Sequence, residues 1–149
     1  MEKRQFTQRG TLMYVIFIPL ILINLYLFTE SILEHGSQTK YYALLSFLFT
    51  LCFACFNKIT ITITETTVAF VMGMGIVKKS YALKDINSCT AHKNSIFNGW
   101  GIRVIQGGWL YNVSGFHSIE LRFKNNAKVI RIGTDKPDEV SSYISKKLQ

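Results

Sequence analysis

Two long runs of apolar side chains dominate the first part of the chain. Residues 11–29 contain no charged side chain, and as a helix they would span about 28 Å, close to the hydrocarbon thickness of a bilayer. Residues 41–57 form a second uncharged run, about 25 Å long as a helix, with Lys40 and Lys58 placed to reach the two interfaces. The pattern predicts a two-helix transmembrane hairpin and assigns residues 1–58 to a membrane anchor.

The hydrophobic period changes after Lys58, where isoleucine and threonine alternate through residues 59–64. Alternation of this kind places the isoleucines on one face of a strand and the threonines on the other. Similar short segments follow at residues 67–72, 76–83, 86–92, 100–105, 109–113, 116–123 and 127–132. We therefore expect residues 59–149 to form a mainly-β sandwich or barrel, built as a meander of about seven antiparallel strands.

The last segment has the period of a helix. Val140, Ile144 and Leu148 recur at helical spacing, Pro137 falls in the first turn, and basic residues fall in the last turn. The pattern predicts one C-terminal α-helix at about residues 136–148, which covers the apolar opening of the β domain.

The distribution of charge predicts the orientation of the chain in the membrane. Lys3, Arg4 and Arg9 precede the first apolar run, whereas the connector at residues 30–40 holds two glutamates and one lysine. From Lys58 onward there are 13 Lys or Arg against 6 Asp or Glu. Because basic flanks stay on the cytoplasmic side, we expect a multi-pass protein of the cell membrane with both termini in the cytoplasm.

The net charge of +8 has two explanations, an anionic membrane surface or nucleic acid. The basic residues are scattered through strand-like segments, and the sequence shows neither a recognition helix nor an aromatic ribonucleoprotein motif. We therefore expect the lipid bilayer as a partner, with a possible protein partner in the membrane or at the inner leaflet, and no nucleic acid.

Cysteine spacing points to no metal or cofactor. Cys52 and Cys55 have redox spacing but lie inside the second apolar run, where thiols lack an electropositive, accessible setting. Cys89 and His92 are three residues apart in a predicted strand, which turns them to opposite faces. We expect no metal site and no cofactor.

The candidates for acid, base or nucleophile do not form a recognisable catalytic pattern. Ser114 precedes His117 closely, but it lacks the glycine context of a nucleophile elbow and fits a turn serine better. Asp85, Glu120 and Asp135 are the acidic groups that an enzyme would have to use with His117. We expect no catalytic residues and a protein that is not an enzyme.

Basic and aromatic residues supply the candidate binding surface. The candidate ligand-binding or partner-binding residues are Lys78, Lys79, Trp100, Arg103, Trp109 and Arg131. Glycines flank both tryptophans, so the indoles could form a shelf that a ligand approaches closely. The alternative is that both tryptophans anchor the core, which is the usual place of tryptophan in a small domain, and we favour it.

Three stretches carry a resemblance to a known group of proteins. They are residues 100–103, residues 108–115 and residues 131–137. Together they resemble the C-terminal domain of small uncharacterised bacterial membrane proteins, similar in layout to the bacterial pleckstrin-homology-like group, in which a membrane hairpin precedes a PH-like β domain. The resemblance implies a fold and a membrane setting but no activity. The first strand-to-strand turn is Glu65-Thr66 instead of a basic cluster, so it implies no inositol-lipid recognition.

These observations favour a membrane-anchored, non-enzymatic binding or scaffold module of unknown ligand at the inner leaflet. An accessory subunit of a larger membrane complex and an uncharacterised enzyme are the alternatives. Within the first apolar run, Asn24 is expected to hydrogen-bond Ser46 or Thr50 across the hairpin, which favours a packed helix pair over a transport path.

Overall fold

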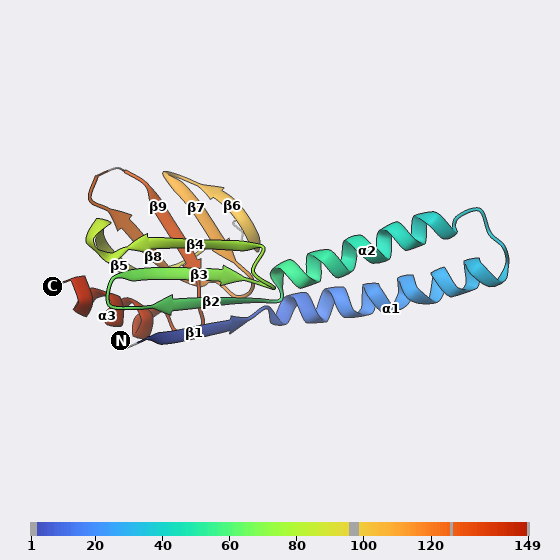
Figure 1. Cartoon of the computed structure of the whole chain (residues 1–149), viewed down its shortest axis with the longest axis horizontal. Helices are drawn as coiled ribbons and strands as arrows, with labels where there is room; N and C mark the ends of the chain where they lie inside the picture. Colours follow the sequence, from blue (N-terminus) through green and yellow to red (C-terminus); the bar gives the residue numbers. More distant parts are fainter. Residues whose placement is uncertain (1–2, 96–98, 126, 149) are drawn as a thin grey trace.

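A long helical hairpin projects from a β domain in the computed structural model of the chain, which describes residues 3–95, 99–125 and 127–148 (Figure 1). Helix α1 spans Thr11–Leu33 and helix α2 spans Thr39–Phe56. Both are long and apolar enough to cross a membrane. The two predicted apolar helices are confirmed, and α1 continues four residues beyond the predicted end.

The helical hairpin is inserted between two paired strands. Strand β1, Arg4–Arg9, leads into α1, and strand β2, Lys58–Ile63, follows α2. The strands are antiparallel, with Arg9 directly opposite Lys58. Residues 4–9 therefore belong to the β domain, although the sequence analysis placed them in the membrane anchor. The strand was missed because Phe6 is the only apolar residue in it.

The first sheet has the strand order β1-β2-β3-β4, with all neighbours antiparallel. Strand β3 spans Thr67–Met72 and β4 spans Val77–Ala82. The three isoleucines of β2 are fully buried, at no more than 1% exposure each, as their alternation with threonine predicts.

The second sheet has the strand order β5-β8-β9-β7-β6. Its strands are β5 Ile86–Lys93, β6 Gly101–Ile105, β7 Gly108–Asn112, β8 His117–Phe123 and β9 Val129–Gly133, and the short helix η1, Leu83–Asp85, precedes β5. Strands β7 and β9 are parallel, so the expected meander is wrong for this sheet. The described residues form nine strands, more than the predicted seven. The alternation of apolar and polar residues identifies each strand, but it does not determine which other strand pairs with it.

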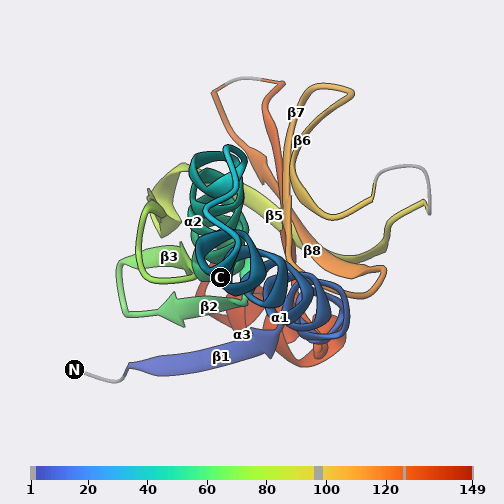
Figure 2. The same ribbon diagram turned by 90° about the vertical axis from the view of Figure 1, so that its right-hand side faces the viewer.

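Helix α3, Pro137–Leu148, covers one side of the core that lies between the sheets. Val140 and Ile144 are completely buried, and the helix packs mainly against β5 and β8. Figure 2, which looks along the helical hairpin, shows the first sheet and the second sheet as separate layers. The predicted C-terminal helix and its apolar face are confirmed.

A polar contact joins the two long helices in their middle. The hydroxyl of Ser46 in α2 donates a hydrogen bond to Oδ1 of Asn24 in α1. Asn24 is only 3% exposed. The predicted bond across the hairpin is confirmed, with Ser46 as the partner.

Candidate functional site

A buried carboxylate lies at the centre of the second sheet, on the face turned away from the first sheet. Neighbouring residues in β8 and β9, such as Ile119 and Ile132, point into the core, so Glu120 and Arg131 point outward. Glu120 stands opposite Thr90 on one side and Arg131 on the other. These strands thus place Glu120 and Arg131 side by side on the outer face.

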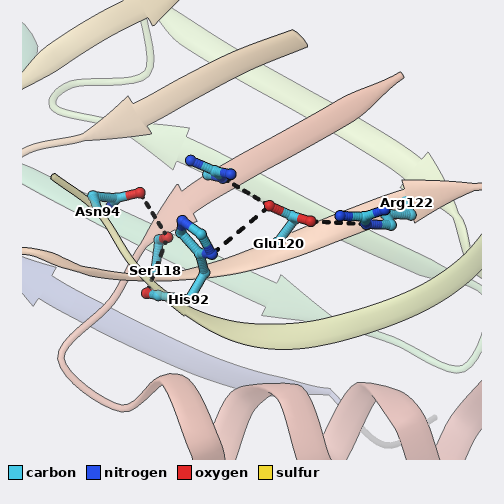
Figure 3. A network of polar contacts seen from close by, with 6 residues as sticks. His92, Asn94, Ser118, Glu120 and Arg122 are labelled. Atoms are coloured by element: carbon cyan, nitrogen blue, oxygen red, sulfur yellow. Dashed lines mark hydrogen bonds and ion pairs between the residues drawn. The ribbon is translucent and has the colours of Figure 1, made fainter. Parts of the chain in front are cut away.

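Two arginines neutralise Glu120, whose side chain is 5% exposed. Nε of Arg131 lies 2.8 Å from Oε2 of Glu120. Nε of Arg122 lies 2.8 Å from Oε1 of Glu120 (Figure 3). Burial is the largest influence on the carboxyl and raises its pKa, but the hydrogen bonds from Arg131 and Arg122 together hold the pKa below its usual value. Glu120 is therefore ionised at neutral pH and is poorly suited to act as a general acid.

His92 lies beside this ion cluster. Its Nδ1 is 3.9 Å from Oε2 of Glu120. Burial lowers the pKa of His92, and the positive charge of Arg131 lowers it further. The imidazole is therefore mostly neutral at pH 7. Ser118 Oγ lies 3.4 Å from the backbone carbonyl oxygen of His92 and 3.3 Å from Oδ1 of Asn94 (Figure 3). These contacts tie β5 to β8.

Among the described residues, the other groups that an enzyme would use form no side-chain hydrogen bond with one another, although Nε2 of Gln8 contacts both Oδ1 of Asp135 and the carbonyl oxygen of Ser114. Asp135 accepts a hydrogen bond from the side chain of Gln8, at 2.8 Å. Asp85 ends the short helix η1, and His117 is exposed at the start of β8. Ser114 lies in the β7–β8 turn, where its N–H donates to Oδ1 of Asn112. The contacts of the described residues thus join none of these groups into a nucleophile and base.

The cysteines are placed as the sequence predicts. Cys89 points into the core, and burial raises the pKa of its thiol to about 12. His92 contacts Glu120 on the opposite face of the sheet. Cys52 and Cys55 are free thiols in α2. Across the described residues, no group of three His, Cys, Asp or Glu side chains is placed to hold a metal ion.

The four basic residues of the candidate surface are divided between the two sheets. Lys78 and Lys79 lie on β4, and Nζ of Lys79 is 5.5 Å from the ring centre of Tyr111. Arg103 lies on β6 and is exposed. Arg131, whose side chain is 19% exposed, forms an ion pair with Glu120. The fold thus separates the lysines from the arginines.

The two tryptophans have different surroundings. Trp100 is partly buried, and its ring centre is 6.1 Å from that of Phe116. Trp109 is 41% exposed, so it is not the core residue that we favoured from the sequence. Tyr111, two residues along the same face of β7, is 2% exposed and packs on Phe70 of β3. The first sheet covers β7 at Tyr111 but leaves Trp109 open.

The β6–β7 hairpin carries an exposed apolar pair of side chains. Val104 stands directly opposite Trp109 and is 74% exposed. Arg103 lies on the other face of the same hairpin, opposite Leu110. Figure 2 shows β6 and β7 standing clear of the first sheet. We name Val104 and Trp109 the hairpin surface.

Sequence reasoning missed Val104 and the ion cluster around Glu120. Val104 is an ordinary strand residue in the sequence, and only its register opposite Trp109 makes an exposed apolar pair. The alternation of Glu120 with buried Ile119 and Leu121 was a usable signal, because it turns the carboxylate away from the core.

Comparison of the chain with protein-family models and with curated proteins found no match. The hairpin surface and the Glu120 cluster therefore have to be interpreted from their geometry. The Glu120 cluster pairs its own charges and holds three strands together. The hairpin surface leaves two apolar side chains open to solvent.

Proposed function

We propose that the chain is a membrane-anchored, non-enzymatic binding module whose β domain lies at the inner leaflet and engages a protein partner through the hairpin surface. The observation that carries this proposal is the insertion of α1 and α2 between paired strands β1 and β2. No flexible linker separates the helices from the sheet at either junction. A bilayer that holds the helices would therefore hold the β domain directly at its surface.

The orientation rests on charge. Strand β1 pairs with β2, so the N-terminal segment and the β domain lie on the same side of any membrane that the helices cross. Both parts are basic, and the connector between the helices is not. The positive-inside rule therefore favours the cytoplasmic side for both termini.

The hairpin surface has the composition of a protein-binding site. Tryptophan is enriched among the residues that dominate binding energy at protein interfaces, and Trp109 is exposed here beside Val104. Strand β6 is also an edge strand, and an edge offers backbone hydrogen bonds to an added strand. These features support a protein partner as the ligand.

The PH-like resemblance contributes only its architecture to this proposal. Two facing sheets with a C-terminal helix fit that layout, but the parallel pairing of β7 and β9 departs from an antiparallel barrel. We propose no inositol-lipid pocket, because the β2–β3 turn carries Glu65, which pairs with Lys147 at 2.9 Å.

Affinity purification of the full chain in a mild detergent tests the proposal. Trp109→Ala should abolish recovery of a stoichiometric partner while the full chain still unfolds cooperatively, because the indole is 41% exposed and lies outside the hydrophobic core. Tyr26→Ala, which removes an exposed aromatic residue from α1, is the matched control and should retain the partner. A partner that is retained by Trp109→Ala would contradict the proposal.

The subunit hypothesis predicts the opposite result in the same experiment. Helix α2 has no buried residue among its described side chains, so its surface is open to lipid or to another helix. If Tyr26→Ala loses the partner and Trp109→Ala keeps it, the helical hairpin is the interface and the chain is a subunit of a membrane complex.

A further inference from the structure

The turn between β3 and β4 lies against the last turn of α2. Its first residue, Gly73, has a φ of +54°, and a Cβ there would come within 2.1 Å of the carbonyl oxygen of Ala54. Glycine is therefore required for the turn to approach the helix this closely. Figure 1 shows the β3–β4 turn at the base of α2.

Backbone N–H groups from outside α2 donate hydrogen bonds to carbonyl groups at its C-terminal end. The last carbonyl groups of a helix have no partner within the helix, and near a hydrocarbon phase an unpaired carbonyl is costly. The N–H of Met74 donates to the carbonyl of Ala54 at 3.1 Å, and the N–H of Gly10 donates to the carbonyl of Asn57 at 2.7 Å. The backbone of Met74 is thus level with a residue inside the second candidate span.

The side chains beside this contact are apolar and exposed. Met74 is 78% exposed and Ile76 is 62% exposed, and residues 73–77 contain no charge. Two uncovered apolar side chains at the depth where a spanning helix ends match the surroundings of a membrane interface.

A pair of like charges lies at the same end of the first sheet. Arg9 and Lys58 are directly opposite each other in the β1–β2 ladder and are both exposed. Neither forms an ion pair with any other described residue within 4.0 Å. Like charges in this position repel each other, and an anion between them removes the cost. Anionic lipid headgroups lie at this depth, just outside the hydrocarbon.

We propose that residues 73–76 together with Arg9 and Lys58 form a lipid-contact edge of the β domain. Met74 and Ile76 enter the headgroup region of an anionic leaflet, while Arg9 and Lys58 bind its phosphates. The inference rests on the proposed membrane anchoring and adds that the β domain is held against lipid on one defined side.

Fluorescence quenching in vesicles of phosphatidylcholine and phosphatidylglycerol tests whether the lipid-contact edge touches the bilayer. The full chain carries Cys52→Ala and Cys55→Ala, and a single cysteine is labelled with an environment-sensitive fluorophore. Cys89 stays in place, because it is buried in the core. The labelled positions are Met74→Cys, Thr66→Cys in the β2–β3 turn at the other end of the sheet, and Leu48→Cys in the middle of α2.

Lipids with a spin label near the headgroup should quench the Met74→Cys probe several-fold more than the Thr66→Cys probe. Lipids labelled deep in the acyl chain should quench the Leu48→Cys probe. Quenching at Leu48→Cys with no difference between Met74→Cys and Thr66→Cys would overturn the lipid-contact edge and leave the anchoring proposal intact. Absence of quenching at Leu48→Cys would overturn both.

The role of the like-charge pair is tested with the same probe. Quenching of Met74→Cys should be stronger in vesicles with phosphatidylglycerol than in pure phosphatidylcholine, and Arg9→Gln with Lys58→Gln should remove that difference. Lys84→Gln with Lys124→Gln, two exposed lysines elsewhere on the domain, should retain it. If the Met74→Cys probe is quenched equally with and without phosphatidylglycerol while Arg9 and Lys58 are present, phosphate binding by these two residues is wrong.

Discussion

Glu120 and His92 make the stability of the second sheet depend on pH in two separate ranges. The folded state holds the pKa of Glu120 below its usual value of 4.5, so its stabilising contribution is present above pH 4.5 and is lost as the pH falls through the lower folded pKa. The folded state also lowers the pKa of His92 from 6.5. The unfolded chain therefore takes up that proton first, and stability falls as the pH drops below 6.5.

We predict that Glu120→Gln lowers the free energy of unfolding by about 2 kcal/mol at pH 7, because Arg131 loses the carboxylate that its partly buried guanidinium needs. The variant should also lose less stability than the parent chain below pH 4.5. His92→Gln should make the free energy of unfolding change less with pH just below pH 6.5. Melting temperatures of the full chain in mild detergent, recorded against pH, measure both effects.

Glu65→Gln is the matched control for this prediction. Its carboxylate is 51% exposed and pairs with Lys147 near the surface, where ion pairs contribute little. If Glu65→Gln lowers the free energy of unfolding at pH 7 as much as Glu120→Gln does, the Glu120 cluster contributes no more stability than a surface ion pair.

Strand β1 is the element whose role differs most from the sequence-based division of the chain. Phe6 is 8% exposed and belongs to the core, and Arg4 forms an ion pair with Glu139 of α3 at 2.6 Å. The side chain of Gln8 also donates to the carbonyl of Ser114 in the β7–β8 turn. A soluble form of the β domain therefore needs residues 4–9 as well as the segment from Lys58 onward.

The register of β1 and β2 suggests how to make that soluble form. The N–H of Gly10 donates to the carbonyl of Asn57 at 2.7 Å, so these two residues can flank a two-residue turn. We predict that replacing residues 11–56 with Asn-Gly yields a soluble protein that unfolds cooperatively in denaturant. A fragment that begins at Lys58 should be less stable by at least about 3 kcal/mol, the usual cost of losing a buried phenylalanine.

Phe6→Ala within the Asn-Gly variant is the control, because it removes the buried ring and keeps the strand. It should account for much of the difference between the two soluble forms. Equal stability of the Asn-Gly variant and the fragment from Lys58 would mean that β1 adds nothing to the domain.

At the scale of the whole molecule, the pairing of β1 with β2 constrains the topology. We predict that both termini lie in the cytoplasm and that the connector between the helices lies outside. In a bacterial host, a fluorescent reporter fused after Gln149 should be active and a phosphatase reporter at the same place inactive. Ser37→Cys, in the connector, should react with a reagent that does not cross membranes.

An active phosphatase after Gln149 would reverse the proposed orientation. A second outcome would contradict the structure itself, namely tags at the two termini that report opposite sides of the membrane. They would contradict the pairing of Arg4–Arg9 with Lys58–Ile63 in the membrane-bound protein.

Local periodicity in the sequence was enough to identify most elements of this protein. The two apolar runs predicted α1 and α2, the alternation of isoleucine and threonine predicted β2, and the spacing of Val140 and Ile144 predicted α3. The bond between Asn24 and Ser46 was also predictable, because few polar side chains lie in the apolar runs and each needs a partner.

Only the tertiary structure decided what depends on contacts between distant residues. Strand β1 is too poor in apolar residues to show its own pattern, and it is stable as a strand because β2 and α3 pack against it. The parallel pairing of β7 with β9 follows from the packing of the sheet. Trp109 is open and Arg131 is neutralised because of where the first sheet ends and where Glu120 lies. Burial and charge pairing are properties of neighbours in space, which a one-dimensional pattern does not contain.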